Sequence, residues 1–523
     1  MGIPSYFSYI VKNHSKIIKR LTELKSINNF YLDSNSIIYD CLRDINNKYD
    51  GNNVKFENLL IKSVIKKLDI YIKFINPSDK TIVAFDGVAP VAKLEQQRTR
   101  RYKSYLMEEI KKSIESKESY KKVWDKTAIT PGTKFMHKLG KRITNYYSKN
   151  LNVIISTSSE PGEGEHKIFQ YIRNHKEYHK NRVTLIYGLD ADLIMLCLNH
   201  MPISKHIYLY RETPEFIKSI NTDLEPNQPY FMDIPELSNA IIEKMTGHKN
   251  KNNINVIHDY IFLCLLLGND FLPHFPSLNI RKSGIHILMA AYYNTLGKTK
   301  KNLSNGKKIL WFHLKILVEY LAEMEHDKIK DEYKDRNKLE SRFYPQTTIE
   351  EKLFKLENIP TQKRELEKFI DPFSYHWESR YYKKLFDLDI NKAYRQCICI
   401  NYLEGLEWVL HYYTTGCIDW RWMYKYNYPP LLKDLLEFIP SWDTRMIENN
   451  NNKPVSEITQ LSYVLPKVSL KLLPKKVEKV LLEKFEDKYP LNCELEWAFC
   501  KYLWESHPKL PNINISELET LIS

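Results

Sequence analysis

The sequence predicts an α/β protein with an open, mainly parallel sheet, followed by a mainly helical second region. Three short apolar runs of strand type, each closed by an acidic motif, predict this class: residues 30–32, 81–85 and 183–187. Strands and helices alternate over residues 1 to about 290, as parallel pairing requires. The carboxyl ends of parallel strands line one crevice, so the acids that follow these runs are expected to converge there.

Seven carboxylates stand in five short segments, most of them flanked by glycine or asparagine. They are Asp33, Asp86, Glu163, Glu165, Asp190, Asp192 and Asp270. A lone aspartate at a strand end is more often a helix cap or turn residue than a metal ligand. Seven together favour ligation, because so many acids share a pocket only when a positive charge neutralises them. No cysteine or histidine cluster competes, so oxygen ligands favour two Mg²⁺ ions, with Mn²⁺ able to substitute, over zinc.

A basic stretch follows Asp86, and Pro90 suits the start of a helix there. Its spacing of i, i+4, i+7 and i+8 places four polar or cationic side chains on one helical face. They are Lys93, Gln97, Arg100 and Arg101. A charged run alone would indicate a solvated helix face. Beside the acids it predicts a pocket for a terminal 5′-phosphate, because guanidinium groups bind phosphate oxygens in pairs.

Many of these segments resemble the XRN family of 5′→3′ exoribonucleases. The resemblance lies in residues 1–7, 32–35, 85–90, 96–101, 129–133, 161–167, 187–195 and 262–273, and in a second family region at 402–410, 420–422, 460–466 and 471–474. It implies a PIN/flap-nuclease-like catalytic core that uses Mg²⁺. It also implies processive degradation of single-stranded RNA, from a 5′-monophosphate end to mononucleotides, as in RNA decay.

The resemblance also assigns roles to particular residues. By motif position the seven acids match the family's metal ligands, and the four residues of the basic face match its 5′-phosphate pocket. The terminal base is expected to stack between Tyr39, where the family usually has histidine, and either Trp420 or Trp422. The sequence does not decide between the two tryptophans.

Net charge agrees with a nucleic-acid substrate. The chain has 78 Lys+Arg against 64 Asp+Glu, a formal charge of +14, which suits a polyanion. The expected partner is single-stranded RNA with a 5′-monophosphate, and nothing in the sequence supports a protein partner such as a decapping factor. Apolar runs too short for a bilayer and the lack of a secretion signal predict an intracellular protein without membrane association. The lack of a CxxC pair argues against a zinc knuckle. Nuclear members of the family often carry such a knuckle, so the resemblance favours the cytoplasm over the nucleus.

We expect three parts along the chain. Residues 1–290 would form the nuclease core with the metal site and phosphate pocket, 291–389 a helical connection with charged surface segments, and 390–523 a second, mainly helical region that completes the active-site pocket. The charged run 325–338 is expected to be a solvated extension of the helix that begins near residue 309. The family's large cytoplasmic members carry extra carboxyl-terminal domains, and we expect a short form without them.

Three other functions compete with RNA degradation. A flap-type, structure-specific DNA nuclease shares the acids, but the helix with residues 96–101 and the second region argue against it. A catalytically silent RNA-binding scaffold would be expected to lose at least one acid, and none is missing. The tryptophan motif disfavours a purely protein-binding role for the tyrosine-rich second half.

Overall fold

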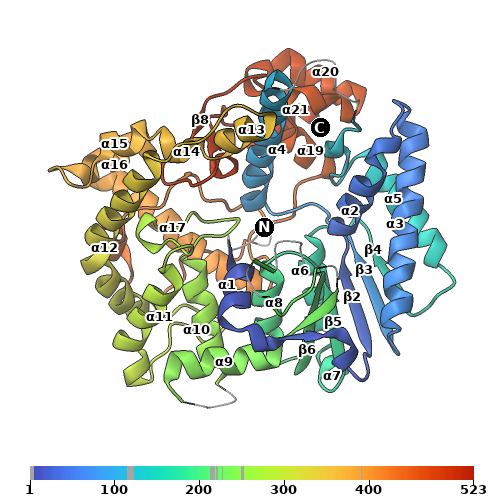
Figure 1. Cartoon of the computed structure of the whole chain (residues 1–523), viewed down its shortest axis with the longest axis horizontal. Coiled ribbons are helices and arrows are strands. Elements are labelled where there is room, and N and C mark those ends of the chain that lie inside the picture. Colours follow the sequence, from blue (N-terminus) through green and yellow to red (C-terminus); the bar gives the residue numbers. More distant parts are fainter. Residues whose placement is uncertain are drawn as a thin grey trace.

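A seven-stranded sheet lies at the centre of the chain, with strand order β1-β7-β6-β5-β2-β3-β4 (Figure 1). The computed structural model describes residues 5–114, 123–212, 218–219, 222–226, 228–248, 253–389, 391–450 and 452–523, so residues 1–4 of the first family segment and position 390 lie outside the described residues. The strands are β1 (Ile18–Arg20), β2 (Asn29–Asp33), β3 (Lys80–Ala84), β4 (Val153–Ser156), β5 (Val183–Tyr187), β6 (His206–Glu212) and β7 (Pro229–Asp233).

Five adjacent strands of this sheet, β6, β5, β2, β3 and β4, run parallel, whereas β7 is antiparallel to β6 and β1 to β7. The predicted mainly parallel sheet is therefore confirmed. The three strand-type runs coincide with β2, β3 and β5 to within one residue at each end. Both faces of these strands are buried, which explains why they are apolar without alternation.

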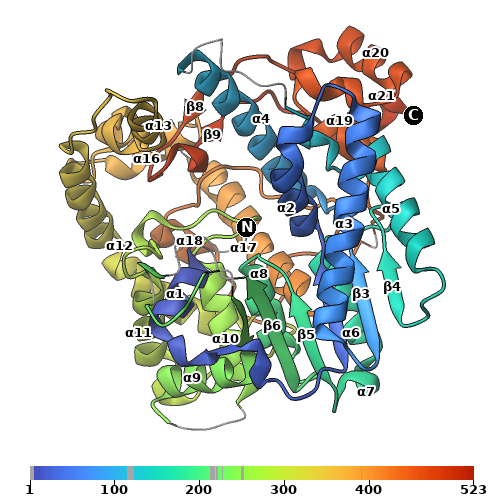
Figure 2. The same cartoon turned by 45° about the vertical axis from the view of Figure 1, so that its right-hand side comes forward.

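Helices cover the two faces of the sheet and make an α/β/α sandwich (Figures 1 and 2). Phe30 and Leu32 of β2 point to one face, where they share a core with three helices. Tyr31 points to the opposite face and a second core, because side chains alternate along a strand. The first layer contains α2 (Asn35–Ile45), α3 (Asn53–Ile75) and α5 (Lys134–Tyr147). The second contains α1 (Tyr6–Asn13), α6 (Gly164–Asn174), α8 (Asp192–His200), α9 (Ile234–Thr246) and α10 (Ile254–Leu265), with the short α7 (Lys176–His179) between α6 and β5.

The second half of the chain extends this second core. Trp408 and Val409 lie in one apolar cluster with Leu196 of α8 and Leu263 of α10. The helices that join it are α11 (Gly284–Thr295), α12 (Trp311–Glu340), α17 (Lys392–Thr414) and α18 (Leu432–Phe438). The division of the chain into three parts stays a prediction.

Two smaller groups of elements surround α4 (Val91–Ile114), the helix that follows β3. The apolar start of α4 packs in one cluster with carboxyl-terminal helices, and further along it contacts a two-stranded sheet and α13. The first group is α19 (Glu457–Val464), α20 (Lys475–Lys484) and α21 (Ile515–Ile522). The second is α13 (Ile349–Glu357), α14 (Ile359–Gln362), α15 (Glu365–Ile370), α16 (Trp377–Leu385), β8 (Leu495–Glu496) and β9 (His507–Pro508).

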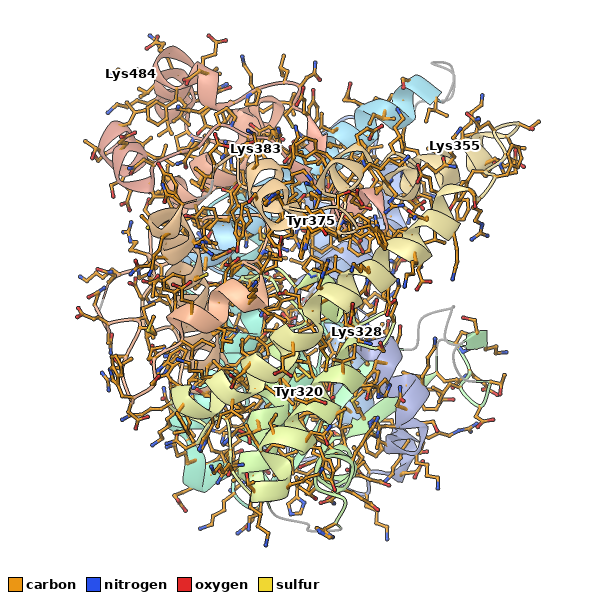
Figure 3. The ribbon with its side chains drawn as sticks, turned by 90° about the vertical axis from the view of Figure 1, so that its left-hand side faces the viewer. Tyr320, Lys328, Lys355, Tyr375, Lys383 and Lys484 are labelled. Carbon is orange, nitrogen blue, oxygen red and sulfur yellow. The ribbon has the colours of Figure 1, made fainter. Side chains whose placement is uncertain are left out.

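Helix α12 contains the charged run that was expected to be solvated. Figure 3 shows Tyr320 and Lys328 on the side of this helix that faces the viewer. On another side, Arg336 is only 3% exposed and its guanidinium lies 2.7 Å from the carboxylate of Glu367. The extension is thus only partly solvated, because α15 supplies an acid that pairs with the buried guanidinium. None of the helices in the described ranges is long and apolar enough to cross a membrane.

Candidate active site

The carboxyl ends of β5, β2, β3 and β4 bring most of the predicted acids to one edge of the sheet. Asp33 is the last residue of β2, and Asp86 lies two residues beyond β3. Glu163 and Glu165 stand at the start of α6 after β4, whereas Asp190 and Asp192 lead from β5 into α8. Asp270 follows α10. This order of strands is why acids distant in the sequence share one site.

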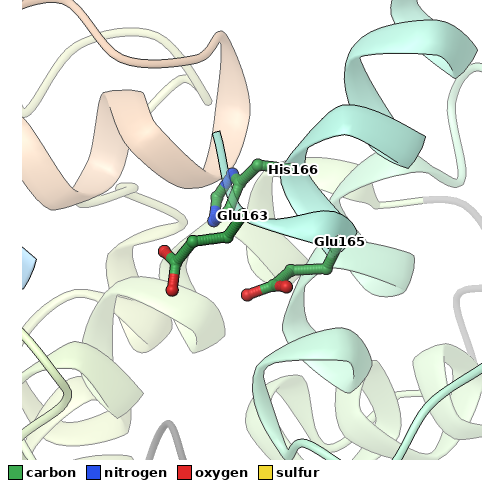
Figure 4. Close-up of side chains that lie close together, drawn as sticks. All are labelled: Glu163, Glu165 and His166. Atoms are coloured by element: carbon green, nitrogen blue, oxygen red, sulfur yellow. The ribbon is translucent and has the colours of Figure 1, made fainter. Parts of the chain in front are cut away.

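Two groups of ligand atoms are close enough to hold a cation. Carboxylate oxygens of Asp33, Asp86 and Glu165 lie within 4.8 Å of one another. The same distance encloses atoms of Glu163, Glu165 and His166, whose side chains lie together in Figure 4. The remaining acids lie close enough to interact with one another and with these groups electrostatically. The charge of Asp190 raises the pKa of Asp33 and of Asp192, and the charge of Asp270 raises the pKa of Asp192.

Backbone and amide groups hold Asp86 in place. The side-chain amide of Asn35 donates to one of its carboxylate oxygens, and the Gly164 N–H at the start of α6 donates to the other over 2.7 Å. A helix amino terminus favours negative charge. A Cβ at position 164 would come within 2.6 Å of Asp33 Oδ1, so glycine is needed for the close approach of α6 to β2.

The buried acids repel one another when no cation is bound. Burial, followed by the charges of neighbouring acids, raises the pKa of Asp33, Asp86 and Glu165. The same causes raise the pKa of Asp192 to about 7. Among the described residues, Asp33 Oδ1 and Asp192 Oδ1 are buried without any hydrogen-bond donor. A buried carboxylate oxygen without a hydrogen-bond donor costs free energy. A bound cation would remove that cost, and these oxygen ligands fit a hard divalent cation.

Lys93 lies among the acids. Its ammonium is 2.8 Å from Glu163 Oε1 and 2.5 Å from Asp270 Oδ2. Burial disfavours the charge, but these carboxylates outweigh burial and raise the pKa of Lys93. Burial likewise raises the pKa of Asp270, yet Lys93 outweighs it and holds that pKa below its usual range. The residue predicted for the phosphate pocket therefore pairs with two predicted metal ligands.

Helix α17 supplies supporting side chains that the sequence analysis missed. The Tyr412 hydroxyl donates to Glu163 Oε2 over 2.9 Å, and Tyr413 hydrogen-bonds to Asp192. The ring of Tyr412 lies between Trp408, at 4.8 Å, and His166, at 3.7 Å between ring centroids. Burial and then the charge of Arg173 lower the pKa of His166, which leaves a neutral ring beside the acids. Its place directly after Glu165 was the available signal for His166, whereas nothing in the sequence marks the two tyrosines.

The predicted phosphate-binding face begins beside the acids and continues along α4. Gln97 is buried, and its Oε1 has no hydrogen-bond donor among the described residues. Arg100 is exposed and Arg101 is half-buried, and both line a cavity of about 1090 Å³ that also reaches Asp270. Within the described chain neither arginine pairs with a carboxylate within 4.0 Å. Burial, followed by the charge of Arg100, lowers the pKa of Arg101 to about 10, so Arg101 stays charged near neutral pH.

The three aromatic candidates for base stacking differ in exposure. Tyr39 is 40% exposed, because α2 turns Ile37, Ile38 and Cys41 toward the core instead. It lies close enough to Arg101 to raise the pKa of that guanidinium. Trp422 is 9% exposed and stacks on Trp408 at 5.3 Å. Trp420 is half-buried, and its carbonyl accepts a hydrogen bond from Val91 at the start of α4. Trp420 therefore keeps the more accessible ring.

The mainly parallel sheet between two helical layers, with acids at its carboxyl edge, defines an α/β protein with a candidate metal site. The family model described as XRN 5′-3′ exonuclease N-terminus matches residues 1–213, and the one described as Xrn1 helical domain matches 250–371 and 373–522. The chain belongs to the XRN family.

Similar curated proteins include 5′-3′ exoribonuclease 2 of Arabidopsis thaliana, 26% identical over 99% of this chain and 66% of that protein. The 5′-3′ exoribonuclease 1 of Saccharomyces cerevisiae is 28% identical over 95% of this chain and 41% of its own length. The human 5′-3′ exoribonuclease 1 is 27% identical over 99% and 34%. This chain thus spans from about a third to two thirds of these relatives. The solved catalytic core of Rad2 in complex with DNA is similar over 63% of this chain and 79% of that one, with 14% identity and a TM-score of 0.34.

Proposed function

We propose that this protein is a metal-dependent 5′→3′ exoribonuclease that hydrolyses single-stranded RNA processively from a 5′-monophosphate end to mononucleotides. The observation that carries the proposal is the group of acids gathered at one sheet edge, where Asp33 and Asp192 keep buried carboxylate oxygens without hydrogen-bond donors among the described residues. The names of the relatives in the same family agree with it.

The acids would hold two Mg²⁺ ions, for which Mn²⁺ could substitute. The candidate ligands are Asp33, Asp86, Glu163, Glu165, Asp190, Asp192 and Asp270. When bound, such ions lower the pKa of a coordinated water and neutralise charge on phosphate oxygens. The protein's own contribution is to hold the carboxylates in place: Tyr412 orients Glu163, Asn35 orients Asp86, and Lys93 holds Glu163 and Asp270 close together.

The arginines of α4 would bind the terminal phosphate. Arg100 and Arg101 lie along the cavity that reaches Asp270 and have no carboxylate partner among the described residues, and Arg101 stays charged near neutral pH. Gln97 brings a buried amide to the same side of the helix. Lys93, held by two acids, would contribute through its charge. A 5′-phosphate bound here would lie next to the acids, which suits removal of one nucleotide at a time.

Capped or 5′-triphosphate RNA should resist digestion. A pocket that offers a single cationic face of α4 to one phosphate, with buried acids on its other side, disfavours a longer and more negative end. We expect initial rates on triphosphate RNA at least about tenfold below those on monophosphate RNA of the same sequence, which corresponds to roughly 1.4 kcal/mol. Equal rates would show that the 5′ end is not enclosed. Treatment of the triphosphate substrate with a pyrophosphohydrolase should restore the rate and serves as the control.

Tyr39 should stack on the terminal base, with Trp420 on the other face. Stacking on an aromatic ring contributes roughly 1–3 kcal/mol per base and tolerates any base. We therefore expect Tyr39→Phe to remain active and processive, whereas Tyr39→Ala releases intermediates after few steps. Product ladders under single-hit conditions measure this. If Tyr39→Ala were as processive as wild type, Tyr39 would be only a packing residue whose hydroxyl makes a structural hydrogen bond.

A direct test compares substrates in one assay. Purified protein with Mg²⁺ would be incubated with labelled 5′-monophosphate RNA, 5′-hydroxyl RNA and flap DNA, each with and without EDTA. We expect mononucleotides from the first substrate alone and none with EDTA. Cleavage of the flap DNA in preference to RNA would identify a structure-specific DNA nuclease. Binding of RNA without any cleavage would identify a silent scaffold.

A further inference from the structure

An arginine that the proposed chemistry does not use lies at the same edge of the sheet as the acids. Arg211 is the last residue but one of β6, which pairs in parallel with β5. The carboxyl ends of parallel strands lie together, so Arg211 stands beside the segment that carries Asp190 and Asp192. In the strand order β6-β5-β2-β3, this end of β6 lies beyond β5 from Asp33 and Asp86 (Figure 2).

The guanidinium of Arg211 is held in place but has no anionic partner. It lies 3.9 Å from the ring centroid of Phe7 in α1, a distance at which a cation and an aromatic face attract each other. Its Nε and Nη1 are buried, and neither donates a hydrogen bond to any described residue. Among those residues it also has no carboxylate partner. A buried donor without an acceptor costs free energy, and a bound anion would remove that cost.

Arg211 stays charged near neutral pH. Burial lowers its pKa to about 10, and the negative charge of Asp190 opposes this effect. When Asp190 holds a cation, as proposed above, its charge is taken up there, and the charge of Arg211 is left for another anion. In a nuclease site that anion is a phosphate, which a guanidinium binds with two parallel hydrogen bonds.

Arg211 and the predicted phosphate pocket approach the acids from different sides. Helix α4 follows β3, and β3 lies three positions from β6 in the sheet, roughly 14 Å at the usual strand spacing. After burial, the pKa of Arg101 responds to Tyr39 and Arg100, whereas that of Arg211 responds to Asp190. An RNA whose 5′-phosphate is bound on α4 and whose first linkage lies at the acids must continue away from α4. Arg211 is a cation on that side.

We propose that Arg211 binds the phosphate of the second linkage of the RNA, the first one downstream of the bond that is cut. This inference rests on the proposed function, because it continues the path of the same strand. Helix α4 would then hold the strand upstream of the cut and Arg211 downstream of it, with the scissile phosphate fixed between them. Phe7 supports the guanidinium from one side. A substrate too short to have a second linkage loses this contact.

The test removes the charge from one partner at a time. The substrates are 5′-labelled RNAs with a 5′-monophosphate, in which a neutral methylphosphonate replaces the second or the sixth linkage. Each is compared with an RNA that differs only at that linkage, and single-turnover release of the first nucleotide gives kcat/KM. For wild type, a neutral second linkage should lower kcat/KM by about 10- to 100-fold. A neutral sixth linkage should leave it nearly unchanged.

Arg211→Met keeps an aliphatic chain against Phe7 and removes the charge. We expect this variant to lose the same factor on unmodified RNA and nothing further on RNA with a neutral second linkage. A 5′-phosphorylated dinucleotide has no second linkage, so Arg211→Met should cleave it at the wild-type rate. Arg211→Lys keeps the charge without the paired hydrogen bonds and should lie between the two. The control Arg142→Ala, which removes an exposed arginine of α5, should match wild type on every substrate.

Two outcomes would overturn this assignment. An equal loss in Arg211→Met on every substrate, the dinucleotide included, would show that Arg211 only supports the acids, and wild-type rates throughout would place the downstream phosphate elsewhere. Thermal melting identifies a misfolded variant, and Arg211→Lys decides if Arg211→Met does not fold. If wild type cleaves no RNA, the proposed function fails. Arg211 is then judged by anisotropy in Mg²⁺: affinity should fall when the second linkage is neutral, and Arg211→Met should remove that difference.

Discussion

Replacing Asp192 by alanine is expected to abolish cleavage of 5′-monophosphate RNA while the binding of that RNA survives. Asp192 is buried at the start of α8, and one of its carboxylate oxygens has no hydrogen-bond donor among the described residues. We expect the other six acids to be engaged as ligands themselves, so that none takes its place. Loss of a group that merely supports a metal ligand costs about 10–100-fold, so loss of a ligand should exceed that range. Single-turnover cleavage in Mg²⁺ measures the rate, and filter binding in EDTA measures affinity. Asp190→Ala is expected to behave in the same way.

The matched control is Asp44→Ala, an exposed aspartate on α2, which should cleave at the wild-type rate. Asp192→Asn keeps the shape and removes the charge, so it should be nearly as inactive as alanine. Full activity of Asp192→Ala in Mg²⁺ would remove this carboxylate from the metal site and would contradict the role of the acids at the end of β5.

Removing both arginines of the phosphate face should largely abolish the preference for a 5′-monophosphate over a 5′-hydroxyl. Arg100 and Arg101 can each form charge-assisted hydrogen bonds worth about 1.5–3 kcal/mol. Arg100→Ala with Arg101→Ala should therefore reduce the ratio of the two kcat/KM values by about 10² to 10⁴. The ratio is the proper measurement, because it cancels general losses of activity.

The control for this pair is Lys141→Ala with Arg142→Ala, two adjacent exposed cations on α5. It removes the same formal charge from a helix outside the cavity lining. We expect a wild-type ratio for it, with at most a slight increase in salt sensitivity. An unchanged ratio in the Arg100 and Arg101 double variant would place recognition of the phosphate elsewhere.

Local patterns predicted the part of the fold that local interactions determine. Apolar runs ending in acids located β2, β3 and β5 because burial on both faces of a parallel strand leaves few polar residues before its end. The helical face from Lys93 to Arg101 was also predictable, since helix periodicity is local. The spacing could not show that Lys93 turns to Glu163 and Asp270, because that depends on segments 70 and more residues away.

Long-range partners account for what the sequence did not predict. Tyr412 reaches Glu163 across 249 positions, and no pattern near either residue indicates this contact. Trp420 and Trp422 stand two positions apart and look equivalent in sequence, yet only Trp422 packs against Trp408. A charged run on a helix usually indicates a solvated face, which is what the sequence predicted for this part of α12. Arg336 is buried instead, because its guanidinium pairs with the carboxylate of Glu367.

The tyrosine donors come from α17, which lies late in the chain, and this position determines when the site is completed during synthesis. Ribosomes make the amino-terminal part first, and domains fold as units as they emerge. The acids up to Asp270 are therefore complete well before the helix that carries Tyr412 and Tyr413 leaves the ribosome. Until then Glu163 and Asp192 lack their hydroxyl donors, and His166 lacks the ring on which it stacks. An unfinished chain thus holds the acids without the groups that orient them.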